Sequence, residues 1–133
     1  MKTNIVIITD VSLFCNIFIP LLTSKNKSIH IDICRSISEI DKKIDFSTCD
    51  LILVDGGMTQ TTSFEVIEFI STAKNSKTPI WFFPEIQTEK YLLKSLDLGV
   101  SRIIRKPFDP LKIVNEILLY LLKVENVPII EYT

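Results

Sequence analysis

Histidine, the commonest catalytic and metal-binding side chain, is nearly absent from this chain of 133 residues. The only histidine, His30, lies in a segment of alternating apolar and polar residues, which predicts an exposed side chain on an edge strand. No metal-ligand spacing surrounds His30. Because His30 is also distant from Asp55 in the sequence, the two residues are not expected to form a nucleophile–base pair. We therefore do not expect an enzyme.

Cysteine is also scarce, and the spacing of Cys15, Cys34 and Cys49 matches no zinc or redox motif. These residues are predicted to be free, reduced thiols of a cytosolic protein. No secretory signal opens the chain, and no apolar run approaches the roughly 20 residues that span a bilayer. The net charge of −1 gives no field that favours nucleic acid or an anionic membrane. We expect a cytoplasmic protein that binds neither directly.

Short apolar runs alternate with longer segments of helical period. The predicted strands cover residues 4–9, 28–34, 50–55, 79–83 and 101–105. The predicted helices cover residues 12–22, 36–44, 62–74, 87–98 and 110–123. Ser12 or Asp10 is expected to cap the first helix, Pro20 to kink or end it, and Asp109 to cap the last. This order requires parallel strands, right-handed crossovers and helices on both sheet faces. We predict one domain over residues 1–123 and a tail over 124–133.

Charged residues follow three of the predicted strands: Asp10 the first, Asp55 the third and Lys106 the fifth. Ligands of open parallel sheets bind beyond the carboxyl ends of the strands, so we expect these side chains to converge. Two carboxylates would form a cation site, and the ammonium would border a space for a phosphate group. Each aspartate alone is equally explained as a helix or turn cap, and Gly56 and Gly57 as a tight turn.

Two segments resemble the receiver domain of bacterial two-component response regulators. Residues 50–58 (DLILVDGGM) are similar to the phosphoacceptor strand and the loop after it, and residues 99–108 end in a similar Lys-Pro-Phe. The resemblance covers about residues 3–123. It implies a flavodoxin-like α/β fold, with a doubly wound, five-stranded parallel sheet of order 2-1-3-4-5 and helices on both faces.

The resemblance also implies roles for individual residues. Asp55 matches the aspartate that accepts a phosphoryl group, and Lys106 matches the lysine that contacts the phosphoryl oxygens. Asp10, Asp55 and the backbone carbonyl of Gly57 match the ligands of a Mg²⁺ ion. Such oxygen ligands suit Mg²⁺, and metal and ammonium together neutralise the charge of a transferring phosphoryl group.

The chain departs from the family pattern at four positions. Thr9 replaces the first of two adjacent acids, which should weaken Mg²⁺ binding. Pro84 replaces a hydroxyl residue that binds the acyl phosphate, Ile103 replaces an aromatic residue whose rotamer follows phosphorylation, and Thr59 replaces a proline. The acceptor is retained, while the parts that convert phosphorylation into a change of shape are missing.

Two hypotheses follow from this pattern. Either Asp55 accepts a phosphoryl group and the signal is read by another route, or the domain signals by protein–protein contact without phosphate. In its most degenerate form the domain is a scaffold or dimerisation module with neither metal nor phosphate chemistry. The expected partners are a histidine kinase or another signalling protein, and a second copy bound through the fourth helix, fifth strand and fifth helix. A flavin carrier of the same architecture is disfavoured, because Asp10 would repel the flavin phosphate.

Overall fold

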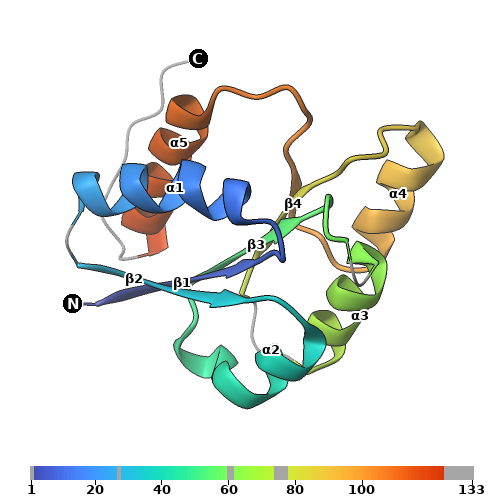
Figure 1. Ribbon diagram of the computed structural model, residues 1–133, viewed down its shortest axis with the longest axis horizontal. Coiled ribbons are helices and arrows are strands. Elements are labelled where there is room, and N and C mark those ends of the chain that lie inside the picture. Colours follow the sequence, from blue (N-terminus) through green and yellow to red (C-terminus); the bar gives the residue numbers. More distant parts are fainter. Residues whose placement is uncertain (1, 27, 60–61, 74–77, 125–133) are drawn as a thin grey trace.

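The computed structural model describes residues 2–26, 28–59, 62–73 and 78–124. Five parallel strands form one sheet in the order β2-β1-β3-β4-β5, as predicted (Figure 1). The strands are β1 (Thr3–Ile8), β2 (Ile29–Cys34), β3 (Leu51–Asp55), β4 (Ile80–Phe83) and β5 (Arg102–Ile103). Because neighbouring strands are all parallel, their carboxyl ends lie along one edge of the sheet.

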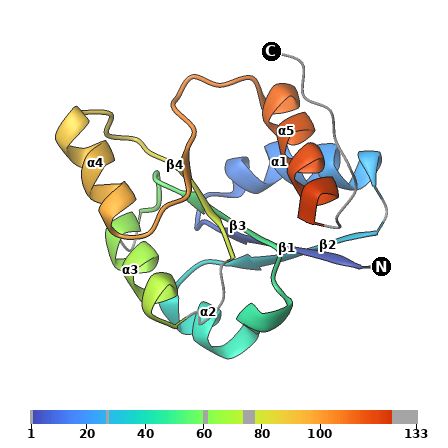
Figure 2. The same cartoon turned by 180° about the vertical axis from the view of Figure 1, so that it is seen from behind.

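Helices cover both faces of this sheet, which is why β3 and β4 are buried along their whole length. Helices α1 (Ser12–Lys25) and α5 (Pro110–Val124) lie on one face (Figures 1 and 2). Helices α2 (Ile37–Lys43), α3 (Ser63–Ala73) and α4 (Glu89–Asp97) lie on the other face, and a short 3-10 helix, Phe46–Thr48, precedes β3. The predicted fold class is confirmed.

The core consists of two apolar clusters, one on each side of the sheet. The cluster beneath α1 and α5 includes the buried residues Phe14, Phe18, Leu22, Leu53, Phe83, Val114 and Ile117. The cluster on the opposite face includes the buried residues Ile8, Ile40, Val54, Val66, Ile67, Ile70 and Phe82. Alternate residues of each central strand contribute to opposite clusters, so the strands that carry the candidate site are fixed from both sides.

The first helix differs from its prediction at both ends. Neither Ser12 nor Asp10 caps it: the N-cap is Val11, without a side-chain hydrogen bond to the first turn. The helix also continues through the exposed Pro20 to Lys25. An interior proline removes one helical hydrogen bond, and burial of Leu22 in the core offsets that loss.

The last strand and the fourth helix are shorter than predicted. β5 has only two residues, and α4 begins after Thr88, whose hydroxyl accepts a hydrogen bond from the Tyr91 N–H. The predicted cap of the last helix is confirmed, because the Asp109 carboxylate accepts a hydrogen bond from the Leu111 N–H at 3.0 Å. His30 is exposed on the edge strand β2, as predicted.

The expected tail, 124–133, lies outside the described residues except for Val124, the last residue of α5. Its separation from the domain therefore stays a prediction. Among the helices of the described residues, none is long and apolar enough to span a membrane.

Candidate functional site

Asp55 is the last residue of β3 and only 2% exposed, so its carboxylate depends on partners within the protein. The Thr9 hydroxyl, at the end of β1, donates a hydrogen bond to Asp55 Oδ2 at 2.7 Å. The backbone N–H of Gly57 donates to Asp55 Oδ1 at 2.8 Å. Both Asp55 oxygens thus accept a hydrogen bond, one from the Thr9 side chain and one from the backbone of the loop after β3.

Lys106 follows β5 and lies beside Asp55, as expected from the strand ends. Its Nζ atom is 3.8 Å from Asp55 Oδ1, an ion-pair distance. The same Nζ atom contacts Glu85 Oε1, on the loop that follows β4. The Gln87 side chain donates a hydrogen bond to the Lys106 carbonyl at 2.9 Å, which joins the loops after β4 and β5.

Four phenylalanine rings connect the elements that carry these side chains. Phe83 pairs with Asp55 across the sheet, and its ring centroid is 5.0 Å from that of Phe14 on α1 and 5.2 Å from that of Phe108. Phe18 stacks on Phe108 with a centroid distance of 5.8 Å. Because Phe108 is two residues after Lys106, this packing fixes the loop that presents the ammonium.

Asp10 lies on the loop between β1 and α1, and its carboxylate is bound to the loop after β3. Its two oxygens accept hydrogen bonds from the Thr59 N–H at 3.0 and 3.1 Å, and the Thr59 hydroxyl donates to Oδ2 at 3.1 Å. The pocket that contains Asp55 and Lys106 is not lined by Asp10. Folding therefore brings Asp55 and Lys106 together, while Asp10 contacts the same loop at Thr59.

Residues 5–118 match the family model of the response regulator receiver domain. The chain belongs to this family. No curated protein sequence matches the chain.

Solved receiver domains show the same fold at low sequence identity. A CheY-like receiver domain from Methanospirillum hungatei has a TM-score of 0.78 at 18% identity, with 95% of this chain and 98% of that chain covered. A two-component response regulator from Clostridium difficile has a TM-score of 0.77 at 21% identity, with coverage of 92% and 98%. The BeF3-activated receiver domain of DrrB, a Thermotoga maritima protein, has a TM-score of 0.74 at 13% identity, with coverage of 91% and 98%.

The receiver-domain residues that would hold a Mg²⁺ ion fit the ion in donor chemistry. Asp10 and Asp55 supply carboxylate oxygens and Gly57 a carbonyl oxygen, and hard oxygen ligands are what Mg²⁺ requires. Within the described ranges, no three His, Cys, Asp or Glu side chains group closely enough to hold a metal by themselves. The neutral Thr9 lowers the negative charge of this donor set, and the bond between Thr59 and Asp10 competes for the Asp10 oxygens.

Two of the four positions that depart from the family pattern, Pro84 and Ile103, are packed into the receiver fold. Pro84 is buried at the end of β4, where it can donate neither a hydroxyl nor a backbone N–H. Ile103, in β5, packs against the cluster on the α3 face. Neither position therefore carries a side chain that can form a hydrogen bond.

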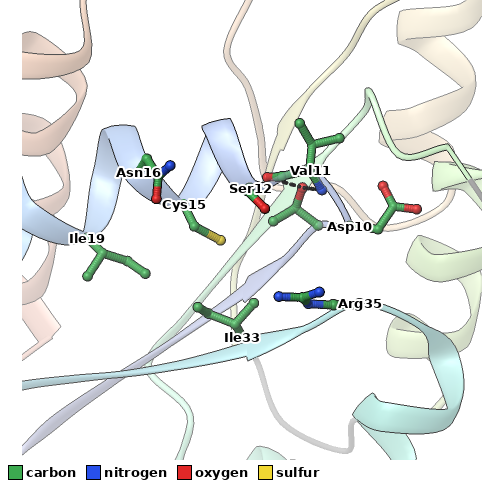
Figure 3. Close-up of a pocket in the computed structure, with 9 residues that line it drawn as sticks. Asp10, Val11, Ser12, Cys15, Asn16, Ile19, Ile33 and Arg35 are labelled. Carbon is green, nitrogen blue, oxygen red and sulfur yellow. Dashed lines mark hydrogen bonds between the residues drawn. The ribbon is translucent and has the colours of Figure 1, made fainter.

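A second pocket lies on the other side of β1, between α1 and β2, with a volume of about 210 Å³. Figure 3 shows Arg35 facing the pocket from beyond β2, with Ser12, Cys15 and Asn16 on α1.

Burial raises the pKa of the Cys15 thiol, and the positive charge of Arg35 opposes this effect. Cys15 is thus held as a neutral thiol, and Cys34 and Cys49 are free and buried.

Two partners in the Asp55 pocket are not among the residues that the sequence predicts. Glu85 follows Pro84 at the carboxyl end of a predicted strand, where the strand-end argument applies equally. Thr9 replaces an acid of the family pattern, and its hydroxyl is a hydrogen-bond donor to Asp55.

Proposed function

We propose that this receiver domain signals through protein–protein contacts that do not require phosphorylation of Asp55. The observation that supports this most strongly is the state of the Asp55 carboxylate, whose two oxygens accept hydrogen bonds from Thr9 and Gly57. Pro84 and Ile103 add to it, because they replace the hydroxyl and the aromatic ring that respond to a phosphoryl group in the family. In this account Asp55 positions the loop after β3 rather than accepting phosphate.

The second candidate function is phosphoryl transfer to Asp55, and the position of Lys106 favours it. With Nζ 3.8 Å from Asp55 Oδ1, the ammonium could neutralise charge on the transferring group. An Asp55 oxygen would form the new P–O bond, and the leaving group would depart with the electron pair of the broken bond. This step uses Asp55 as nucleophile and Lys106 as the group that contacts the phosphoryl oxygens.

Mg²⁺ binding is proposed as a weak property of the same pocket. Asp10, Asp55 and the Gly57 carbonyl would hold the ion, and Thr59 would have to release the Asp10 carboxylate. A bound Mg²⁺ would supply positive charge next to a phosphoryl group. With Thr9 in place of an acid, the ligand charge is lower by one than in the family pattern.

The proposed partners are a histidine kinase or another signalling protein in the cytoplasm. Helices α4 and α5 expose leucines that a partner could cover, among them Leu93 at 54%, Leu96 at 45% and Leu119 at 49% exposure. The same α4, β5 and α5 face would serve for a homodimer.

The proposed function is tested in the native host with an Asp55→Asn chromosomal variant, compared with the wild type and with a deletion strain. We expect the transcript profile of the Asp55→Asn strain to follow the wild type and to differ from the deletion. A profile that follows the deletion, while purified Asp55→Asn remains folded, would favour the second candidate. Phosphate-affinity electrophoresis of the same extracts shows whether wild-type protein carries a phosphoryl group that the variant lacks.

A further inference from the structure

Lys106 lies between two carboxylates rather than beside one. Its Nζ atom contacts Glu85 Oε1 and is 3.8 Å from Asp55 Oδ1. The Lys106 side chain is 28% exposed and that of Asp55 is 3% exposed, whereas Glu85 is 54% exposed. The buried carboxylate therefore shares its cation with a carboxylate on the solvent side of the pocket.

The Glu85 carboxylate also lies over Gly57, directly beside the acceptor. A Cβ atom placed on Gly57 would be 2.7 Å from Glu85 Oε1 and 3.2 Å from Asp55 Oδ1. The lack of a side chain at residue 57 thus lets the Glu85 carboxylate approach the Asp55 oxygen that Lys106 faces. The pocket at this place has a volume of about 220 Å³ and is lined on its polar side by Asp55, Gly57, Glu85 and Lys106.

The backbone of the loop after β4 holds Glu85 in this position. Gly56 packs closely against it: a Cβ atom there would be 2.7 Å from Pro84 Cα and 2.9 Å from the Glu85 nitrogen. The Gly56 N–H donates to the Phe83 carbonyl at 2.8 Å, on the strand that leads into this loop. Proline fixes φ at residue 84, which further limits the conformations of the loop. Glu85 is therefore presented to Lys106 by packed backbone.

We infer that Glu85 is an internal anionic ligand of Lys106 that competes with any external phosphoryl group at Asp55. Asp55, Glu85 and Lys106 together carry one net negative charge, so an incoming anion meets an ammonium that is already paired. Without the Glu85 charge the three groups would be neutral, and the ammonium would face the pocket. The inference rests on the proposed function, because it takes the Asp55 pocket as the receiver site. It identifies Glu85 as the residue that pairs with the Lys106 ammonium in this pocket.

The test is the affinity for beryllofluoride, a tetrahedral phosphoryl analogue, in wild-type protein, Glu85→Gln and Glu89→Gln, at one Mg²⁺ concentration. Beryllium accepts an electron pair from an Asp55 oxygen and releases a bound water, with no change of oxidation state. Chemical shifts of the Gly57 amide report occupation of the pocket. We expect Glu85→Gln to bind about tenfold more tightly than wild type, since charged hydrogen bonds are the stronger ones. Glu89→Gln removes the same charge from the exposed first turn of α4 and should behave as wild type.

Every other outcome overturns the inference. Equal affinities of wild type and Glu85→Gln, including no binding by either, would show that Glu85 does not compete for Lys106. A similar gain in Glu89→Gln would show a general effect of net charge. Failure of the proposed function is seen separately, as loss of output in the Asp55→Asn strain, and leaves the ratio of beryllofluoride affinities unaffected.

Discussion

Thr9 shows how one substitution changes the character of the whole pocket. Its hydroxyl donates to Asp55 Oδ2 and also accepts a hydrogen bond from the Val11 N–H at 3.0 Å. A single neutral side chain therefore joins the end of β1, the start of α1 and the buried carboxylate. Where the family usually has an acid that would draw a metal toward Asp55, this chain has a donor that satisfies Asp55 directly.

Replacement of Thr9 by valine should destabilise the fold, because valine has the same shape but no hydroxyl. The buried Asp55 oxygen and the Val11 N–H both lose a partner, which predicts a loss of about 1–3 kcal/mol in unfolding free energy. Urea denaturation at neutral pH measures this change. Thr72→Val on the exposed face of α3 is the matched control and should cost less than about 0.5 kcal/mol. A Thr9→Val variant as stable as the control would contradict this role.

Replacement of Thr9 by aspartate should restore metal affinity, because Mg²⁺ binding rises with the negative charge of its ligands. We expect Thr9→Asp to bind Mg²⁺ about tenfold more tightly than wild type in calorimetric titrations. Thr72→Asp adds the same charge far from the pocket and serves as the control. If Thr9→Asp gains no more affinity than Thr72→Asp, the pocket around Asp55 is not the metal site.

At the scale of elements, the ends of helices and the loops after strands decide what the pocket contains. The loop between α4 and β5 is an example, because Gly99 adopts a φ of 114° there. The Ser71 hydroxyl on α3 donates to the Leu98 carbonyl at 2.7 Å, which ties the end of α4 to α3. This turn directs the chain into β5 and so toward Lys106.

A Gly99→Ala variant should lose about 1–2 kcal/mol of unfolding free energy from the backbone conformation alone. The reason is that L residues with a side chain rarely adopt a positive φ. The new Cβ atom would also lie 2.5 Å from the Ser71 hydroxyl oxygen. A double-mutant cycle with Ser71→Ala separates the two effects, and we expect the double variant to lose less than the sum of the single ones. Unchanged unfolding free energy in Gly99→Ala would contradict the strained turn.

The order of elements could be predicted from the sequence because apolar runs such as residues 51–54 alternate with segments of helical period. The convergence of Asp55 and Lys106 followed from the rule that parallel strands end at one edge. The bond from Thr59 to Asp10 could not be predicted, because it depends on the shape of two loops. The contact of Glu85 with Lys106 depends in the same way on the packing of Gly56 against residue 84.

At the scale of the whole molecule, buried thiols make the stability of the fold decrease at alkaline pH. Burial raises the pKa of Cys34 to about 11 and that of Cys49 to about 12, from an ordinary value of 9.0. A raised pKa in the folded state means that the unfolded chain releases these protons first as pH increases. The thiols therefore contribute stability that is fully present below pH 9 and is lost between about pH 9 and 12.

We expect the urea midpoint of the wild type to fall as pH rises from 8 to 10, within the window that these shifts set. A Cys34→Ala/Cys49→Ala variant should start lower, because it leaves cavities, but should fall less over the same range. Cys15→Ala is the control, since this thiol is less buried. Parallel curves for wild type and the double variant would exclude the two thiols as the cause.

The packing of the whole sheet edge presents a receiver pocket whose cation is already paired and whose acceptor oxygens already carry hydrogen bonds. The central question is therefore whether Asp55 takes up phosphate in the unmodified protein. Intact mass of wild type and Asp55→Asn, after incubation with acetyl phosphate and Mg²⁺, measures this directly. We expect no added phosphoryl group on either protein. A stoichiometric phosphoryl group on wild type that is absent from Asp55→Asn would contradict it.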